Sequence, residues 1–233
     1  MTTPARPKHP AQYTPSIIDT FDGLLDLPAG ATVIDTFAGL GDRAAEWCSR
    51  RGWHFVGVEL EEWAGCVQGD ATNLPIRSSS IDGAFTSTTY ANGLADPALH
   101  WTNPKGRRTY DLFLGADLRS SNSGRCGLRG RGDRGYIAYL DIEYRAFVEL
   151  HRVLRPGAPF LLNCSDVVAD ERLHPVTGDN ATAAVRAGFA IEAWHHVPTP
   201  RYRNGRNADA RADHEDVVVL RKPHPITATP TLF

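Results

Sequence analysis

The sequence predicts an α/β fold, built on a doubly wound and mostly parallel β-sheet within a single domain of residues 1–233. Three observations support this prediction. Apolar runs of strand length, such as Val33-Ile34 and Phe55–Val58, alternate with longer stretches of helical periodicity. A glycine-rich turn follows the first of these runs, and an acidic residue ends each of them. A chain of 233 residues with 42% hydrophobic content can also bury a sizeable core.

The first expected helix begins at Thr14-Pro15. Threonine is a favoured N-cap, and proline is favoured in the first turn because its missing N–H is not needed there. Apolar side chains then recur at helical spacing through Ile17, Ile18, Phe21 and Leu24-Leu25. The pattern therefore predicts an amphipathic helix that packs against the sheet.

A glycine-rich turn follows the strand expected at Thr32–Asp35. The turn, Phe37–Gly41, reads F-A-G-L-G, and glycine permits a backbone path too tight for side chains. Asp42 is the expected N-cap of a helix over Arg43–Arg51. The next strand, His54–Glu59, ends in a carboxylate about 20 residues after the glycine turn, as in sites that bind a ribose. We therefore expect a nucleoside cofactor here, with a ligand-free glycine turn as the alternative.

The rest of the chain continues the alternation. Further strands and helices are expected at Cys66–Gln68, Ile81–Thr86, Tyr139–Leu154 (helix), Pro159–Cys164, Asn180–Ala187 (helix), Phe189–Trp194 and Asp216–Leu220. Arg155-Pro156-Gly157 ends the long helix. The segment Asn163–Asp166 ends the strand expected at Pro159–Cys164, so its polar groups should face the same edge as the glycine turn. Substrate contact and simple strand termination are both open interpretations of these groups.

Residues 91–135 form a long basic segment without sustained helical or strand periodicity. The segment holds eight basic and four acidic residues, a formal charge of +4 in a chain whose total is −2. Its basic residues are Lys105, Arg107, Arg108, Arg119, Arg125, Arg129, Arg131 and Arg134. A glycine-rich, arginine-dense loop is typical of a surface that binds a phosphate backbone, and a solvated insertion is the alternative. His195-His196 and Arg201–Arg211 predict a second basic loop with the same two interpretations.

Composition argues against several classes of protein. No segment reaches the apolar length of a membrane span, and Met1–Pro10 lack the apolar core of a signal peptide. The four cysteines are scattered, which predicts reduced thiols rather than a zinc site or a disulfide framework: Cys48, Cys66, Cys126 and Cys164. We therefore expect a cytoplasmic protein; the sequence leaves its oligomeric state open.

The order of the motifs carries a family resemblance. Five segments, in this order, resemble the motifs of S-adenosylmethionine-dependent methyltransferases: D-T-F-A-G-L-G, V-G-V-E-L, Q-G-D-A-T-N-L-P, I-D-G-A-F-T-S-T-T-Y and L-H-R-V-L-R-P-G. The F-A-G-L-G at 37–41 and T-S-T-T-Y at 86–90 are similar to the amino-methylating DNA methyltransferases, which modify cytosine N4 or adenine N6. Lys8–Pro15 resembles the N-terminal cofactor motif of that family. The resemblance runs from about Lys8 to Leu220 outside the basic segment. It implies a Rossmann-like fold of the class I methyltransferase type.

The resemblance also implies S-adenosylmethionine as the cofactor and a role for each matching residue. The methionine part of the cofactor would be surrounded by Asp35, Phe37, Gly39 and Gly41. The ribose would be bound by Glu59, and the adenine would contact Asp70 and Ala71. Tyr13 and Thr14 would close over the cofactor, and Thr86 is a further cofactor-binding residue.

The T-S-T-T-Y motif implies the transfer chemistry. An exocyclic amine is a poor nucleophile, because its lone pair is delocalised into the ring. The Ser87 hydroxyl and the Thr88 backbone carbonyl would accept its two N–H groups and aim the lone pair at the methyl group. Tyr90 would stack on a base swung out of a duplex. No metal is expected, since the methyl donor is already a cation.

Two residues depart from the family pattern. Thr88 and Thr89 stand where the family has prolines, so two backbone N–H donors are restored, while Thr86, Ser87 and Tyr90 are retained. The expected function is methylation of DNA, of the kind found in restriction–modification. A serine at position 87, in place of an acid, favours cytosine over adenine as the target base. Methylation of an RNA amine, or cofactor and nucleic-acid binding without turnover, are the alternatives.

Overall fold

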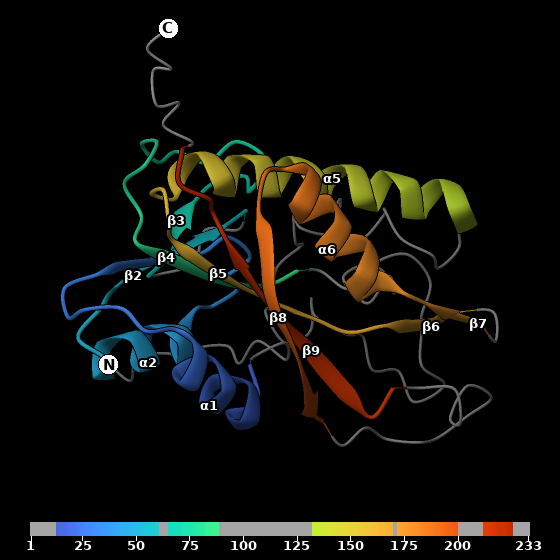
Figure 1. Cartoon of the computed structure of the whole chain (residues 1–233), viewed down its shortest axis with the longest axis horizontal. Helices are drawn as coiled ribbons and strands as arrows, with labels where there is room; N and C mark the ends of the chain where they lie inside the picture. Colours follow the sequence, from blue (N-terminus) through green and yellow to red (C-terminus); the bar gives the residue numbers. More distant parts are fainter. Residues whose placement is uncertain (1–12, 61–64, 89–131, 170–171, 200–211, 226–233) are drawn as a thin grey trace, which may run out of the picture.

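The computed structural model describes residues 13–60, 65–88, 132–169, 172–199 and 212–225, which build one seven-stranded sheet flanked by helices (Figure 1). The strand order is β3-β2-β1-β4-β5-β9-β8, and β9 runs antiparallel to both of its neighbours. The strands are β1 (Thr32–Asp35), β2 (His54–Glu59), β3 (Val67–Gln68), β4 (Gly83–Ser87), β5 (Pro159–Cys164), β8 (Ala190–Pro198) and β9 (His214–Arg221). The predicted doubly wound, mostly parallel sheet is confirmed.

Helices cover both faces of the sheet (Figure 1). The pair α1 (Pro15–Leu24) and α2 (Asp42–Arg50) lies on one face, and the pair α5 (Gly132–Val153) and α6 (Val176–Arg186) lies on the other. Beyond β5, a small hairpin of β6 (Val167–Ala169) and β7 (Arg172–His174) forms a separate two-stranded sheet, which the sequence did not predict.

Alternation of side chains along the central strands divides the core in two. Val33 and Phe85 belong to the apolar cluster under α1 and α2, whereas Ile34 and Ala84 belong to the cluster under α5 and α6. All four side chains are fully buried, as expected for parallel strands covered on both faces. Residues at the strand ends therefore point to one face or the other according to their parity.

Phe85 is the centre of the core beneath α1 and α2. Its ring centroid lies 5.0 Å from that of Trp47, 5.5 Å from Phe21, 5.9 Å from Tyr13 and 6.1 Å from Phe55. These rings come from both helices, from β2 and from the segment before α1. The cluster therefore fixes the positions of elements whose ends meet at the carboxyl edge of the sheet.

Several predicted boundaries are confirmed, and one cap is corrected. Thr14 caps α1 by accepting a hydrogen bond from the Ile17 N–H at 3.4 Å, with Pro15 in the first turn. Asp42, however, is the first residue of α2, and the N-cap is Gly41. Gly41 adopts a left-handed conformation, with φ of 66°, which ends the turn one residue earlier than expected. The negative charge of Asp42 in the first turn interacts favourably with the positive end of the helix dipole.

The helix α5 begins earlier than predicted, within the segment expected to be a basic loop. It starts at Gly132 instead of Tyr139, so the last four residues of the predicted 91–135 segment are helical. Two contacts of Tyr136 explain the extension: its hydroxyl donates to Asp179 Oδ2 on α6 at 2.6 Å, and within α5 its ring stacks on that of Tyr139. These contacts override the low helix propensity of glycine in this region.

The last two strands are also longer than predicted, and α6 begins at Val176 instead of Asn180. Because β8 extends to Pro198, His195-His196 lie in a strand and not in the predicted loop. Cross-strand pairing along β9 stabilises this extension beyond the apolar run. Within the described residues, no helix combines the length and apolarity that a membrane crossing requires.

Removal of the Phe85 ring is expected to destabilise the fold strongly. The variant Phe85→Ala should lose about 3–5 kcal/mol of unfolding free energy, because the side chain is fully buried among rigid rings. Urea denaturation measures the effect. The control Ile137→Ala, at a side chain that is 66% exposed, should change stability by no more than about 0.5 kcal/mol. Equal losses in the two variants would contradict this account of the core.

Candidate active site

The carboxyl ends of four parallel strands bring polar side chains to one edge of the sheet. Asp35 ends β1, Glu59 ends β2, Ser87 ends β4, and Asn163 lies opposite Ser87 on β5. From β1 the chain adds β2 and β3 on one side and then crosses back to add β4 and β5 on the other side, so the strand order reverses at β1. In open α/β sheets, this point of reversal is where ligands bind.

Asp35 is the most constrained group at this edge. Its side chain is only 1% exposed, and it accepts three hydrogen bonds from neutral donors. Thr86 Oγ1 donates to Oδ1 at 2.7 Å, the Phe37 N–H donates to Oδ1 at 3.0 Å, and the Tyr13 hydroxyl donates to Oδ2 at 2.8 Å. Burial raises the pKa of Asp35 from 3.8 to about 6 against these hydrogen bonds, and the charge of Glu59 adds to the rise.

The glycine turn is tied to the second carboxylate. The Gly39 N–H donates to Glu59 Oε2 at 2.9 Å, and the Leu60 N–H donates to Oε1 at the same distance. Gly39 has a φ of 55° and Gly41 a φ of 66°, conformations that favour glycine. The two backbone amides orient the Glu59 carboxylate, and a carboxylate offers about four acceptor positions in all.

Gly57 allows the turn to approach β2. A Cβ at this position would lie 2.9 Å from Cys66 Sγ and 3.0 Å from Ala38 Cβ, which no side chain tolerates without a shift. The Ala38 N–H also donates to the Val58 carbonyl at 3.1 Å. In the sequence Gly57 is one residue of an apolar run, and a glycine inside a predicted strand is the signal that could have indicated a close backbone approach.

The segment after β3 lies beside Glu59. The Gly69 N–H donates to the Glu59 carbonyl at 2.9 Å, which brings Asp70 and Ala71 to this part of the edge. Asp70 is exposed, and its Oδ1 accepts from both the N–H and the hydroxyl of Thr72 at 2.8 Å. Ala71 is 7% exposed. Their predicted contacts with an adenine stay predictions.

Tyr13 and Thr14 approach the edge from the segment before α1. Besides its bond to Asp35, Tyr13 accepts a hydrogen bond at its backbone carbonyl from the Arg43 guanidinium on α2. The Thr14 hydroxyl caps α1 and lies 2.9 Å from Ser16 Oγ. The structure therefore brings Tyr13 to Asp35, whereas the Thr14 side chain is occupied in capping.

The predicted amine acceptors diverge at the end of β4. Ser87 is partly exposed, and its Oγ accepts from Asn163 Nδ2 at 3.4 Å; the same amide donates to Glu215 Oε2 at 3.0 Å. Thr88 is 3% exposed, and its hydroxyl belongs to a cluster on the other face of the sheet. Thr89 and Tyr90 lie outside the described residues. Of the Asn163–Asp166 segment, Asn163 is the residue that reaches Ser87.

The buried polar cluster around Thr88 was not predicted. Asn180 Nδ2 donates to the Tyr139 hydroxyl at 2.7 Å and lies 3.5 Å from Thr88 Oγ1 and 3.3 Å from Cys164 Sγ. Burial raises the pKa of Cys164 to about 12 and that of Tyr139 well above its usual value. Both groups are therefore neutral, and the Thr88 hydroxyl is occupied in the interior.

The predicted basic surface lies mostly outside the described residues. Of the eight basic residues of the insertion, only Arg134 falls within the described part, exposed on α5. The other seven, and Arg201–Arg211 of the second loop, lie outside it. Their binding to a phosphate backbone stays a prediction.

Comparison with known proteins identifies the fold. No family model and no curated protein sequence matches the chain. Among solved structures, the [4+2]-cyclase SpnF matches with a TM-score of 0.53 and 16% identity over 89% of this chain and 80% of that one. A SAM-dependent methyltransferase of Methanosarcina mazei matches with a TM-score of 0.52 and 13% identity over 92% of this chain and 100% of that one. A third match is a chain from the complex of the Haloferax volcanii Trm112 methyltransferase activator with a methyltransferase. Its TM-score is 0.52, with 11% identity over 90% of each chain.

The fold is that of the class I methyltransferases. At these identities the likeness concerns the fold alone. The cyclase illustrates the limit, because its name describes chemistry other than methyl transfer. The activity of this chain must therefore be argued from the residues of its own site.

The raised pKa of Asp35 predicts a pH-dependent stability penalty. The folded state binds the Asp35 proton more tightly than the unfolded state does. Protonated Asp35 therefore adds to the free energy of unfolding, and this contribution is fully present below pH 3.8 and is lost as the pH rises through about 6. The variant Asp35→Asn removes the charge, so at about pH 8 it should be more stable than wild type, by on the order of 2 kcal/mol.

Thermal and urea unfolding between about pH 4 and pH 8 measure this difference, which should shrink on acidification. The control Asp141→Asn, at an exposed carboxylate paired with Arg145, should follow wild type across the range. A variant that is less stable than wild type at the alkaline end would contradict the assignment.

Proposed function

We propose that the protein binds S-adenosylmethionine at the carboxyl edge of β1 and β2 and transfers its methyl group to an exocyclic amine of a DNA base. The observation that carries the proposal is the pair of oriented carboxylates, Asp35 and Glu59, on either side of a left-handed glycine turn. This arrangement places one buried and one partly exposed acidic group at the ends of adjacent strands, and each accepts a backbone N–H of the same glycine turn.

The two carboxylates match the two polar ends of this cofactor. The donors to Asp35 are all neutral, so its buried charge favours a cationic ammonium group. Glu59 is held by two backbone amides and suits neutral ribose hydroxyls. The left-handed conformations of Gly39 and Gly41 give the turn the tight backbone path that the methionine part would lie against.

The residues of β4 and β5 suit the orientation of an amine. When bound, S-adenosylmethionine supplies a methyl group that its sulfonium already activates. Ser87 is partly exposed at the end of β4, and its hydroxyl oxygen is an acceptor that already lies 3.4 Å from Asn163 Nδ2. Ser87 would accept one N–H of the base and the Thr88 carbonyl the other, and Asn163 acts as a positioning residue for Ser87.

The assignment to DNA rests on the resemblance of residues 86–90 to the amino-methylating DNA methyltransferases and on the charge of the basic segment. A transfer assay with methyl-labelled cofactor, on duplex DNA and on transfer RNA, tests it. Label in DNA supports the proposal. Label in RNA alone moves the acceptor to RNA, and cofactor binding without transfer to either leaves a nucleic-acid-binding protein without turnover.

Loss of the Ser87 hydroxyl should impair transfer without impairing cofactor binding. The variant Ser87→Ala should lower kcat on the order of 100-fold, because one of the two acceptors that orient the amine is removed. Single-turnover transfer and equilibrium dialysis measure the two effects separately. The control Ser49→Ala, at an exposed serine of α2, should match wild type in both. Unchanged turnover in Ser87→Ala would refute this assignment.

A further inference from the structure

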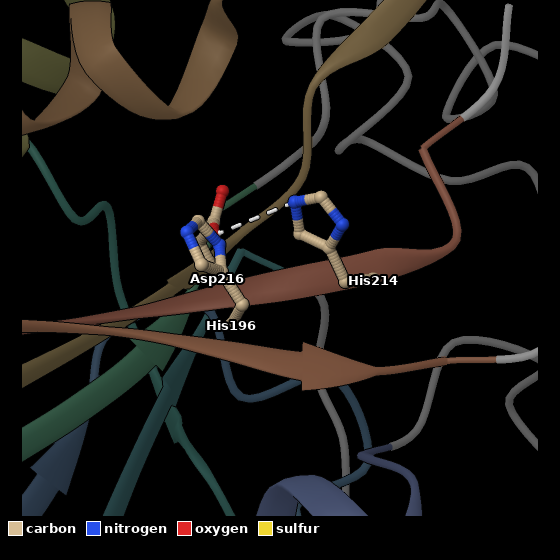
Figure 2. Close-up of side chains that lie close together, drawn as sticks. All are labelled: His196, His214 and Asp216. Atoms are coloured by element: carbon tan, nitrogen blue, oxygen red, sulfur yellow. Dashed lines mark hydrogen bonds and ion pairs between the residues drawn. The ribbon is translucent and has the colours of Figure 1, made fainter.

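Two histidines and an aspartate gather at the same edge of the sheet, on the last two strands. Figure 2 shows the rings of His196 and His214 turned toward the carboxylate of Asp216. His196 Nδ1 lies 2.5 Å from Asp216 Oδ1, and His214 Nε2 lies 3.8 Å from the same oxygen. One ligand atom of each residue lies within 4.8 Å of the others.

The strand register holds the three residues on one face. His196 on β8 is directly opposite Asp216 on β9, and His214 precedes Asp216 by two residues, so its side chain points the same way. Asp216 has the parity of Val218 and Leu220, which pack under α5 and α6. Paired strands are rigid supports, so the donor atoms are largely organised before any ligand binds.

Exposure and hydrogen bonding suit a metal ligand set. The Asp216 side chain is 7% exposed, whereas His196 is 68% and His214 35% exposed, so a buried carboxylate forms the floor and the rings form an open rim. His214 Nδ1 lies 3.2 Å from Asp213 Oδ1, which leaves Nε2 to face the group. A carboxylate that holds the far nitrogen of a histidine is the usual support of a metal-bound imidazole.

We propose that His196, His214 and Asp216 bind one divalent first-row transition-metal ion of the Zn²⁺ type. Two imidazoles and one carboxylate form a donor set for such ions, whereas Mg²⁺ and Ca²⁺ prefer sites made of oxygen atoms. Donors around a tetrahedral Zn²⁺ lie about 3.3 Å apart, so each of the two contacts with Asp216 changes by less than about 1 Å on binding. Three protein ligands leave a coordination position for water.

The ion would lie apart from the proposed transfer site. Asp216 lies on the face under α5 and α6, whereas Ser87 and Asn163 have the parity of Phe85 and Leu161, which pack under α1 and α2. The inference does not depend on the proposed function. It also agrees with the expectation that methyl transfer itself needs no metal.

Zn²⁺ binding to the full chain tests the proposal. The protein, freed of metal with a chelator, is titrated with ZnCl₂ in competition with a chromogenic chelator, and Co²⁺ absorption spectra report the ligand geometry. We expect one Zn²⁺ per chain at this site and no competition from Mg²⁺. The variant Asp213→Ala should weaken binding about 10- to 100-fold, and His196→Ala or His214→Ala should weaken it more.

His195→Ala is the matched control, because this neighbouring histidine of β8 has the opposite parity and lies on the other face. It should bind Zn²⁺ as wild type does, and Zn²⁺ should raise the Tm of both. The Tm of His196→Ala without metal reports whether that variant is folded. The proposal is overturned if wild type binds no Zn²⁺, if His196→Ala and His214→Ala bind it undiminished, or if His195→Ala alone loses it.

Discussion

The buried carboxylate of Asp35 is the constraint on which the candidate site depends. Its three donors come from separate parts of the chain: Tyr13 before α1, Phe37 in the glycine turn and Thr86 on β4. A buried charge is unfavourable unless such donors surround it, so the segments are held in register by one side chain. Even with these donors, burial raises the pKa of Asp35, so its charge stays unfavourable, which is typical of a group kept for binding at the expense of stability.

The alternation of side chains along β4 and β5 places the proposed amine-binding groups on one face of the sheet and the buried polar cluster on the other. Ser87 and Asn163 point to the face under α1 and α2, where Tyr13 also lies, whereas Thr88 and Cys164 point to the face under α5 and α6. This separation gives a physical account of the first departure from the family pattern. The hydroxyl that replaces a proline ring joins the Asn180–Tyr139 cluster, and the Thr88 backbone stays at the end of β4.

Local signals in the sequence were enough to predict the parts of the fold that local residues determine. The strands Thr32–Asp35, His54–Glu59 and Pro159–Cys164 have the predicted bounds, because each is an apolar run ended by turn or polar residues. The acidic ends of the first two strands, with their spacing, located the carboxylate pair. The start of α5 was missed, because contacts with α6 decide it.

Long-range pairing explains the other omissions. The contact of Asn180 with Thr88 joins residues 92 positions apart, and the His196–Asp216 pair follows from an antiparallel register that no local pattern specifies. Such groups become visible only when strand order and parity are known. The predicted roles that remain untested are those of single residues toward ligands, not the positions of the strands that carry them.

Equilibrium dialysis of the intact chain against labelled S-adenosylmethionine tests the central claim most directly, since it requires neither a substrate nor turnover. The account predicts saturable binding of one molecule per chain, displaced by S-adenosylhomocysteine and weakened as the pH falls through about 6, where Asp35 takes up its proton. Absence of saturable binding at neutral pH, in protein whose folding is verified by a cooperative unfolding transition, would contradict it.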